Sequence, residues 1–300
     1  MGSFPQSIVH YLPVTDHDER WGIVCTTAGH QHVPPGTPYP VSEHPEHYLF
    51  YKGSGRTLDE YQLVYITAGR GRFESASCPS QTVEAGTMLL LFPNEWHSYS
   101  HDPGTGWTEW WVGFRGANID RLEQQGFLCR RRPLLRIGCS GGIERCYREI
   151  IGTVEEERVG FQPLISSIVL HILGSVLFKH SNLLYSDNPV VEKINRAKAI
   201  MRTDFGRNHS PEQIAREVGM GYTWFRRVFR EYVGMAPAQY QHTMRLNKAR
   251  ELLATTAHSI SEIAYALGFE SVSAFSLFFR LRERLSPSQY RARFRGGKGQ

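Results

Sequence analysis

The stretch Ile263-Ala264-Tyr265-Ala266-Leu267-Gly268-Phe269 decides the fold of the C-terminal third of this 300-residue chain, because its pattern occurs twice. The matching residues of the two copies stand 49 to 50 positions apart. They are Ile214-Ala215, Val218-Gly219, Phe225, Phe229, Pro237 and Tyr240 in the first copy, and Ile263-Ala264, Leu267-Gly268, Phe275, Phe279, Pro287 and Tyr290 in the second. A repeat of this kind predicts two copies of one supersecondary unit.

Each copy begins with residues that start a helix. Ser210-Pro211-Glu212-Gln213 opens the first copy and Ser259-Ile260-Ser261-Glu262 the second, so a serine can cap each helix while Gln or Glu returns to the backbone. A short apolar stretch then reaches Gly219 or Gly268, where glycine tolerates the positive φ of a tight turn. A second helix follows, which predicts two helix-turn-helix units. The predicted units cover residues 210–232 and 259–284.

The second helix of such a unit lies in the major groove of DNA, so its outward face decides what it reads. In the first copy the expected buried stripe is Phe225, Val228, Phe229 and Tyr232. The residues expected to point away from it are Thr223, Trp224, Arg226, Arg227 and Arg230. Arginine can fork onto guanine or phosphate and threonine can touch a thymine methyl group, so we expect these five residues to contact DNA.

The second copy carries a single charge on the corresponding face. Its outward residues are Ser273, Ala274, Ser276, Leu277 and Arg280. Ser271 is the expected cap of this helix. We expect this face to contact DNA as well, with weaker or less selective reading of bases.

An ordinary two-helix corner is the alternative, since the turn chemistry alone is common. Charge favours DNA binding instead. Residues 186–300 contain 19 Lys/Arg and 10 Asp/Glu, a net charge of +9, whereas residues 1–185 contain 15 and 19, a net charge of −4. This asymmetry is expected when only one part of the chain approaches a polyphosphate.

Residues 237–255 are predicted to form one continuous helix between the two units. Its apolar positions are Tyr240, Met244, Leu246, Leu252 and Leu253, and its polar positions are Arg245, Lys248 and Arg250. Two units on one face of B-DNA need reading helices roughly 34 Å apart, and a rigid helix can set that spacing.

The N-terminal part has short strand-like runs, such as residues 61–66 and 88–93, with expected turns at Gly69-Arg70-Gly71 and Ala85-Gly86. They predict a small all-β barrel that closes before Gly116. Helical spacing follows at 143–157 and 161–179, and the second helix looks too short to span a membrane, which needs about 20 residues. The expected organisation is a barrel domain with dimerisation helices at 1–180, a linker at 181–189 and an all-α DNA-binding domain at 190–300.

Residues 190–295 resemble the DNA-binding domain of the AraC family of bacterial transcription regulators. The resemblance is carried by residues 263–269, Phe275, Phe279-Arg280 and Ser286-Pro287-Ser288-Gln289-Tyr290-Arg291. Two residues depart from the family pattern: Leu277, where a polar or basic residue is frequent, and Arg284, where glycine is usual. These departures affect the contacts of the second copy rather than the fold.

The N-terminal part resembles the cupin-like effector domain of the same family. Residues 85–87, 91–93, 97–99 and 107–114 carry this resemblance. In sugar-responsive members the barrel binds a monosaccharide, which places Trp111 at the ring-stacking position, Tyr99 and Glu109 at hydroxyl-binding positions, and, more loosely, Arg56 and Thr26 or Thr27 at two others. The arabinose-sensing member has histidine where this chain has Glu109, so the effector need not be arabinose. Trp110 and Trp111 are adjacent in a strand, so only one of them can face the pocket.

A catalytic cupin would need two or three histidines and a carboxylate around a metal ion. The strand after Gly69 lacks paired histidines, and His97 stands nearly alone on the later strand. His30, His32, His44 and His47 sit in Pro-rich segments and are expected to be surface loop residues. We therefore expect no metal, no cofactor and no enzymatic activity. Five cysteines without a Cys-x-x-Cys pair, and no visible secretory signal, favour the cytoplasm.

These features together predict a ligand-responsive, sequence-specific transcription regulator. The resemblance implies a homodimer that activates sugar-utilisation genes, with double-stranded DNA, a small sugar-like effector and RNA polymerase as partners and no membrane association. Residues 16–40 are the expected mobile or ligand-covering segment. Two alternatives remain open: a cupin enzyme with an appended DNA-binding module, and an effector-independent regulator whose barrel only dimerises.

Overall fold

The computed structural model describes residues 7–38, 55–185 and 189–295. The chain divides into two compact units, residues 1–184 and 185–300. The first unit contains β1 (Ser7–Tyr11), α1 (Asp16–Glu19), β2 (Val24–Val33), β3 (Tyr61–Ser75), β4 (Cys78–Glu84), β5 (Thr87–Leu91), β6 (His97–His101), β7 (Trp107–Arg115), α2 (Ala117–Gln124), β8 (Leu134–Arg136), α3 (Gly141–Glu156) and α4 (Phe161–Tyr185). The second contains α5 (Pro189–Thr203), α6 (Pro211–Glu217), α7 (Tyr222–Val233), α8 (Pro237–Thr255), α9 (Ile260–Ala266), α10 (Val272–Glu283) and α11 (Pro287–Arg295).

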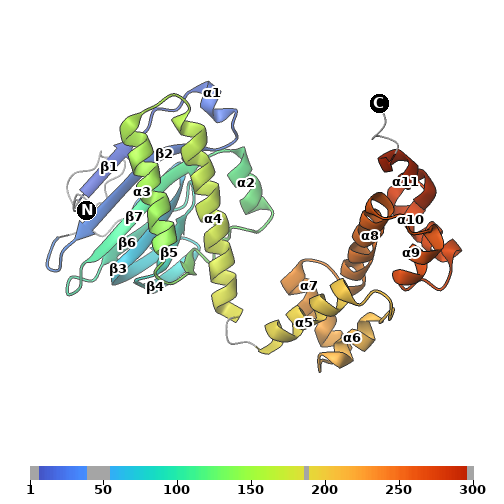
Figure 1. Cartoon of the computed structure of the whole chain (residues 1–300). Helices are drawn as coiled ribbons and strands as arrows, with labels where there is room; N and C mark the ends of the chain where they lie inside the picture. Colours follow the sequence, from blue (N-terminus) through green and yellow to red (C-terminus); the bar gives the residue numbers. More distant parts are fainter. Residues whose placement is uncertain (1–6, 39–54, 186–188, 296–300) are drawn as a thin grey trace. The chain divides into compact units, whose positions relative to one another are not determined.

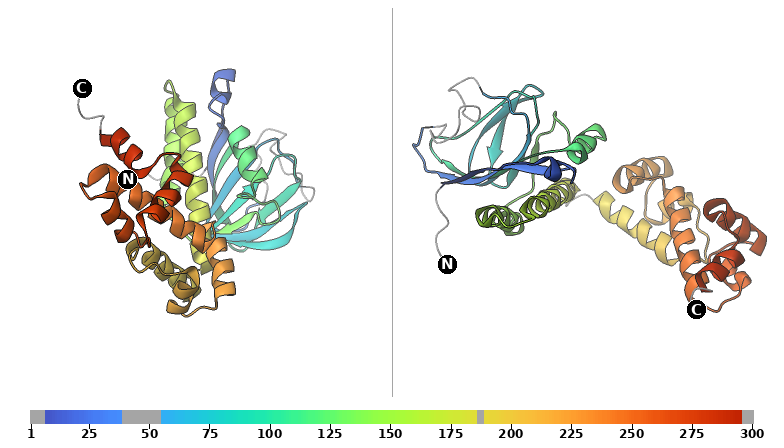
Figure 2. Two further views of the ribbon diagram at one scale, coloured as in Figure 1. Left: turned by 90° about the vertical axis from the view of Figure 1, so that its right-hand side faces the viewer. Right: turned by 90° about the horizontal axis from the view of Figure 1, so that it is seen from above.

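The strands of the first unit form one antiparallel sheet with the order β1-β2-β7-β3-β5-β8, and β4 and β6 both pair with β3. The long strand β3 has two sets of neighbours. Its first half pairs with β5 and β7, and its second half pairs with β4 and β6. This change of partners along one strand curls the sheet into the open barrel seen in Figure 2. The predicted all-β barrel is therefore confirmed.

Two details of the predicted barrel are wrong. Gly69-Arg70-Gly71 is not a turn but lies inside β3, just after a register shift between Ile66 and Ala68. Gly69 has a φ of +78°, and a Cβ there would lie 2.1 Å from the carbonyl oxygen of Gly106, so glycine permits a bend within the strand rather than a reversal. The barrel also does not end before Gly116, because β8 joins the sheet beside β5.

Helices α3 and α4 lie side by side across one face of the sheet (Figure 1). Their apolar residues share one core with the strand residues that alternate toward them, including Leu63, Tyr65 and Trp110. The intervening strand residues, including Val64 and Trp111, belong to a second core inside the barrel. The two tryptophans therefore face opposite sides of β7, as the period of a strand requires.

Helix α4 is longer than the sequence suggested. It has 25 residues, and Phe161–Leu183 is long and apolar enough to cross a membrane by length and composition, so the length argument against a span was wrong. One side of the helix is nevertheless committed to the sheet, because Gln162 accepts a hydrogen bond from the backbone N–H of Cys25 at 3.1 Å and donates to its carbonyl at 3.0 Å. The helix also continues to Tyr185, into the segment expected to be a linker, and residues 186–188 lie outside the described residues.

The second unit contains both predicted helix-turn-helix pairs, α6–α7 and α9–α10. Ser210 with Gln213 and Ser259 with Glu262 form the expected reciprocal capping boxes. Ser271 accepts a hydrogen bond from the backbone N–H of Ala274 at 3.1 Å and caps α10 as predicted. The departure at Arg284 has a physical counterpart, because this residue ends α10 in the left-handed conformation that Gly234 adopts at the end of α7.

Helix α8 belongs to the cores of both helix-turn-helix units. Its Tyr240 packs in the first core with Phe225 and Phe229, and its Ala249 and Leu253 pack in the second core. The helix has 19 residues, so it spans about 28 Å. A single helix thus connects the two helix-turn-helix units, as the sequence predicted.

The loop between α5 and α6 reinforces this connection. The Gln241 side chain donates a hydrogen bond to the carbonyl of His209 at 2.7 Å, and Arg245 donates to the Asn208 side chain at 2.5 Å. Arg245 is buried, although the sequence placed it on the polar side of the helix. The same loop also contacts the turn of the second helix-turn-helix unit, since a Cβ added to Gly268 would lie 2.3 Å from the carbonyl oxygen of Phe205.

Replacing Gly268 with alanine should lower the free energy of unfolding of residues 185–300 more than the matched replacement of Gly219 does. Both glycines have positive φ, +73° and +66°, so each alanine costs about 1–2 kcal/mol of left-handed strain. Only Gly268 adds a clash with backbone, worth roughly a further 1–3 kcal/mol. Urea unfolding of the full-length chain, followed by helical circular dichroism, measures both values. Equal losses for the two variants would show that the loop does not constrain the Gly268 turn.

Candidate DNA-binding face and effector pocket

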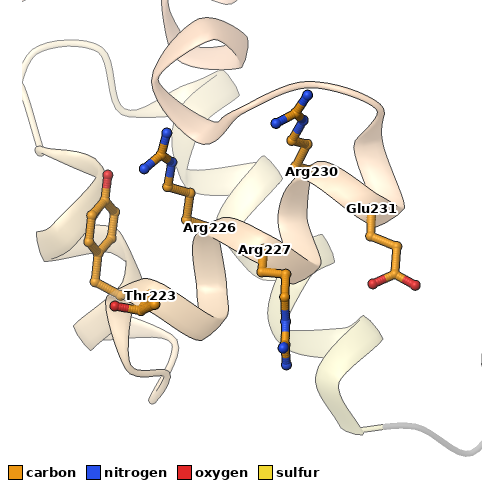
Figure 3. A pocket seen from close by; sticks show the side chains of 6 residues that line it. Thr223, Arg226, Arg227, Arg230 and Glu231 are labelled. Atoms are coloured by element: carbon orange, nitrogen blue, oxygen red, sulfur yellow. The ribbon is translucent and has the colours of Figure 1, made fainter.

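Helix α7 presents a basic outward face. Phe225 and Phe229 are fully buried beneath it, and the capping box of α6 and the turn at Gly219 fix its direction. The residues around the exposed surface enclose a hollow of about 590 Å³, lined by Tyr222, Thr223, Arg226, Arg227, Arg230 and Glu231. Figure 3 shows that Arg226 and Arg230 extend to one side of the helix and Arg227 to the other. Three guanidinium groups can therefore reach different atoms of one groove.

These three arginines are available for a ligand. Within the described part of the chain, none of them forms an ion pair, whereas Arg250 is bound to Glu283 and Lys248 to Glu251. An uncommitted arginine does not have to break an internal salt bridge before it binds phosphate or a guanine edge. The positive charge of this face is thus free to attract nucleic acid.

Trp224 lies on a different side of α7 from Arg226 and Arg230 and is three residues from Arg227. It lines a hollow of about 180 Å³ with Val190, Val191 and Ile194 of α5 and with Val228, Glu231 and Tyr232. The structure therefore places Trp224 beside α5, while Thr223 shares the hollow of the arginines. Contact between Trp224 and DNA remains a prediction.

Helix α10 presents the second predicted face. Ser273, Ala274, Leu277 and Arg280 are exposed, and Ser276 is partly exposed. Phe275 and Phe279 are fully buried beneath them, in the same positions as the two phenylalanines of α7. The two helices are thus equivalent in packing and differ in outward chemistry.

The barrel interior presents an aromatic ring. Trp111 lies beside Gly29 of the neighbouring strand β2, where an ideal Cβ would be 2.1 Å from the indole Cζ2 atom. Any larger residue would displace the ring, so the glycine lets the indole lie flat against the barrel wall. Tyr99 of β6 and Trp107 of β7 belong to the same inner core. An aromatic face of this kind suits the apolar side of a ring-shaped ligand.

Arg56 brings a positive charge into this interior. Its guanidinium donates hydrogen bonds to the hydroxyl of Tyr99 at 3.0 Å and to Nε2 of His97 at 3.3 Å. Burial and the neighbouring Arg56 lower the pKa of His97 to about 3, so this histidine is neutral at physiological pH. A neutral His97 can accept the hydrogen bond that orients Arg56.

Glu109 is the unusual group of the interior. It lies on the same side of β7 as Trp111, it is buried, and its Oε2 atom has no hydrogen-bond partner among the described residues. Burial raises the pKa of Glu109 to about 8, and the charge of Arg56 lowers it only in part. A buried acceptor without a partner is costly, so a ligand that donates a hydrogen bond here gains free energy.

The sequence reasoning missed Glu60 and Gln62. Glu60 accepts a hydrogen bond from Gln62 at 2.7 Å and lies within hydrogen-bond distance of Thr26 and Thr27. Of the predicted site residues, Thr27, Tyr99, Glu109 and Trp111 are buried and Arg56 is partly buried. Arg56 contacts Tyr99, whereas Thr27 contacts Glu60. Strand alternation could have found Gln62, because Val64 and Ile66 on the same face are inner-core residues.

The histidine prediction needs correction. His30 and His32 lie in strand β2 rather than in a loop, and His30 is buried with its ring 4.0 Å from that of Trp110. His44 and His47 lie outside the described residues. The described part of the chain contains no group of three or more metal-ligating side chains. Ten residues of the segment expected to be mobile, residues 16–40, form strand β2, which is paired on both sides, and four more form α1. Residues 39–40 lie outside the described residues.

Comparison with known proteins follows the same division of the chain. A helix-turn-helix domain family matches residues 214–293, and the AraC-like ligand binding domain family matches residues 48–173. The raffinose operon transcriptional regulatory protein RafR of Pediococcus pentosaceus is 24% identical over 250 residues, which cover 80% of this chain and 87% of RafR. The transcriptional activator RhaS of Salmonella paratyphi B is 26% identical over 245 residues, which cover 78% of this chain and 85% of RhaS.

Among solved structures, the DNA-binding domain of AdpA, determined in complex with a target DNA, is 32% identical to this chain. The match covers 38% of this chain and 99% of that domain, with a TM-score of 0.34.

Glu109 should make the stability of the chain depend on pH. Its folded pKa of about 8 exceeds the ordinary value of 4.5, so the folded state binds the extra proton between these values. The free energy of unfolding contributed by this group is therefore fully present below pH 4.5 and is lost as the pH rises toward 8, by at most about 1.4 kcal/mol per pH unit.

The Glu109→Gln variant removes this titration, so the difference in unfolding free energy between variant and wild type should shift in favour of the variant from pH 5 to pH 8. Urea unfolding at several pH values measures the difference. His97 is present in both proteins, so its contribution to the pH dependence cancels in this difference. A difference that stays constant with pH would rule out the raised pKa.

Proposed function

Because the chain belongs to the AraC family of transcription regulators, we propose that it regulates sugar-utilisation genes as an effector-dependent, sequence-specific activator in the cytoplasm. The main support is the combination, in one chain, of an uncommitted arginine face on the reading helix α7 and an aromatic, polar barrel interior. The names of RafR and RhaS add support at low identity, since one is a raffinose operon regulator and the other an activator.

We assign DNA contacts to Thr223, Trp224, Arg226, Arg227 and Arg230 of α7 and to Ser273, Ala274, Ser276, Leu277 and Arg280 of α10. For the effector, Trp111 stacks on the ring, Glu109 and Tyr99 bind hydroxyl groups, and Arg56 and Thr27 complete the site. The Glu109 carboxyl group, whose Oε2 atom has no partner among the described residues, argues for a ligand with hydrogen-bonding groups, and the hydroxyl groups of a sugar can both donate and accept. We propose neither a cofactor nor catalysis for this barrel.

Replacing Arg227 with alanine should weaken specific DNA binding more than nonspecific binding. Loss of a bidentate contact to guanine costs about 1–3 kcal/mol, a five- to 150-fold loss of affinity, whereas loss of a phosphate contact weakens all sequences alike. Electrophoretic mobility shifts on a promoter fragment and on scrambled duplex, at several salt concentrations, measure both affinities. Equal losses on the two duplexes would reduce Arg227 to a phosphate contact. Lys248→Ala is the matched control, because Lys248 is already paired with Glu251.

Replacing Trp111 with alanine should abolish the effector response and leave DNA binding intact. A monosaccharide at about 100 times its dissociation constant should stabilise the wild-type chain by about 2.7 kcal/mol. A thermal-shift screen of monosaccharides, uronic acids and short oligosaccharides measures this on wild type and variant. The hypothesis fails if the variant keeps the full shift. If no compound stabilises the wild type, the effector-independent alternative gains support.

We propose that the chain acts as a homodimer through the outward side of α4. Leu164, His171 and Phe178 repeat every seven residues there and are exposed. A seven-residue repeat is the spacing by which two helices pack along a seam. Sedimentation of the purified chain as a monomer at micromolar concentration would contradict this arrangement. RNA polymerase is the proposed further partner, and in vitro transcription with and without effector tests activation.

A further inference from the structure

The outward faces of α7 and α10 can be compared position by position. The two helices are related by an offset of 50 residues, since Phe225 corresponds to Phe275 and Phe229 to Phe279. At this offset Arg226 and Arg227 of the first copy are replaced by Ser276 and Leu277 in the second. These two positions of the outward face therefore carry two positive charges in α7, and a hydroxyl group and an apolar side chain in α10.

The apolar residues on α10 are held toward solvent by the fold. Leu277 is 53% exposed and Leu281 is 71% exposed, while the opposite side of the helix contributes two fully buried phenylalanines to the second core. The helix cannot rotate to bury these leucines without exposing Phe275 and Phe279. Together with exposed Ala274, the leucines form an apolar stripe at helical spacing on the outward face.

The charges around this stripe favour DNA as the molecule that covers it. Exposed arginines follow it in the last turn and beyond, at Arg280, Arg282 and Arg284. Arg282 lies over the ring of Phe278 at 4.0 Å, which leaves Arg280 and Arg284 free of any described ion pair. Positive charge at the rim attracts phosphate, and an apolar centre suits a base edge without hydrogen-bonding groups.

We propose that α10 reads thymine methyl groups through Leu277 and Ala274, and that the two half-sites are therefore recognised by different chemistry. The proposal rests on the proposed function, in which both helices enter major grooves. The thymine C5-methyl is the apolar group that the major groove displays, and it marks A·T pairs by contact alone. The α7 half-site is read by arginines and contains guanine, while the α10 half-site is rich in A·T pairs with thymines turned toward Leu277.

Leu281 provides a matched internal control. It is at least as exposed and as apolar as Leu277 but lies one turn further along α10, in the last turn of the helix. In a helix-turn-helix unit the N-terminal residues of the reading helix contact base edges. Leu281 is therefore predicted to contribute nothing to the reading of thymine.

The first step of the experiment identifies the binding site directly, from random DNA. The full-length chain selects binding sites from a random duplex library made with thymidine and, in parallel, from the same library made with deoxyuridine. Deoxyuridine pairs like thymidine and lacks only the methyl group. We expect both libraries to yield the guanine-containing half-site, and the second half-site, about one helical turn away, to be enriched more strongly from the thymidine library.

The second step is a cycle of protein and DNA changes on the selected site. Removing one contacted methyl should weaken binding about fourfold, which is the effect of about 0.8 kcal/mol for a methyl-sized group. Leu277→Ala should lose a similar factor on thymidine duplex and almost nothing further on deoxyuridine duplex. Leu281→Ala should match the wild type on both. Deoxyuridine in the α7 half-site should leave the loss caused by Leu277→Ala unchanged, because Leu277 does not contact that half-site.

Three results would overturn the proposal. Equal affinity for thymidine and deoxyuridine in the second half-site removes the methyl contact. If Leu277→Ala loses the same factor in affinity on both duplexes, the Leu277 side chain does not contact the thymine methyl group. Unchanged DNA binding by Leu277→Ala together with reduced transcription assigns the apolar face to a protein partner. If neither library is enriched for any site, sequence-specific binding itself fails, which is distinguishable from loss of the second half-site alone.

Discussion

The double use of helix α8 is the constraint on which the DNA-binding unit depends. One end of this helix completes the core around Phe225 and the other completes the core around Phe275, so neither helix-turn-helix pair can move without disturbing a helix that the other needs. The loop before α6 adds a second connection through Asn208 and Arg245. Two reading helices held in this way bind as one rigid object, which avoids the ordering cost that two flexibly linked modules would incur on DNA.

The effector unit depends on the alternation of strand residues in the same manner. Strands β2, β3, β5 and β7 face helices α3 and α4 on one side and the interior on the other, and the neighbouring tryptophans of β7 follow this division. Trp110 packs against the helices, with the guanidinium of Arg148 4.6 Å from its ring centre. The residues that face the interior can therefore differ in chemistry without disturbing this packing. The interior then tolerates what a core usually excludes, namely a buried carboxyl group at Glu109 whose Oε2 atom has no partner among the described residues.

The sequence predicted those parts of the structure that depend on local rules. Capping boxes, the glycine turns, the continuous helix at 237–255 and the opposite orientations of Trp110 and Trp111 all follow from residues close together in the chain. The failures required distant information. The bend of β3 at Gly69 depends on the backbone of Gly106, the late strand β8 depends on a free edge of β5, and the burial of Arg245 depends on a loop more than 30 residues earlier. Gln62 was within reach of the alternation rule, whereas Glu60 was not, since it precedes the strand.

The two copies of the repeat show how folding and recognition are carried by separate residues. The buried positions are nearly the same in both, which is why the repeat is visible in the sequence and why both helices pack alike. The outward positions have diverged from Arg to Ser and Leu without any change in helix length, since α7 and α10 each have 12 residues. Even the strained end of α10, where Arg284 takes the left-handed conformation of Gly234, keeps the helix boundary in place. A scaffold fixed by its interior therefore leaves the outward face free to specify different bases in the two grooves.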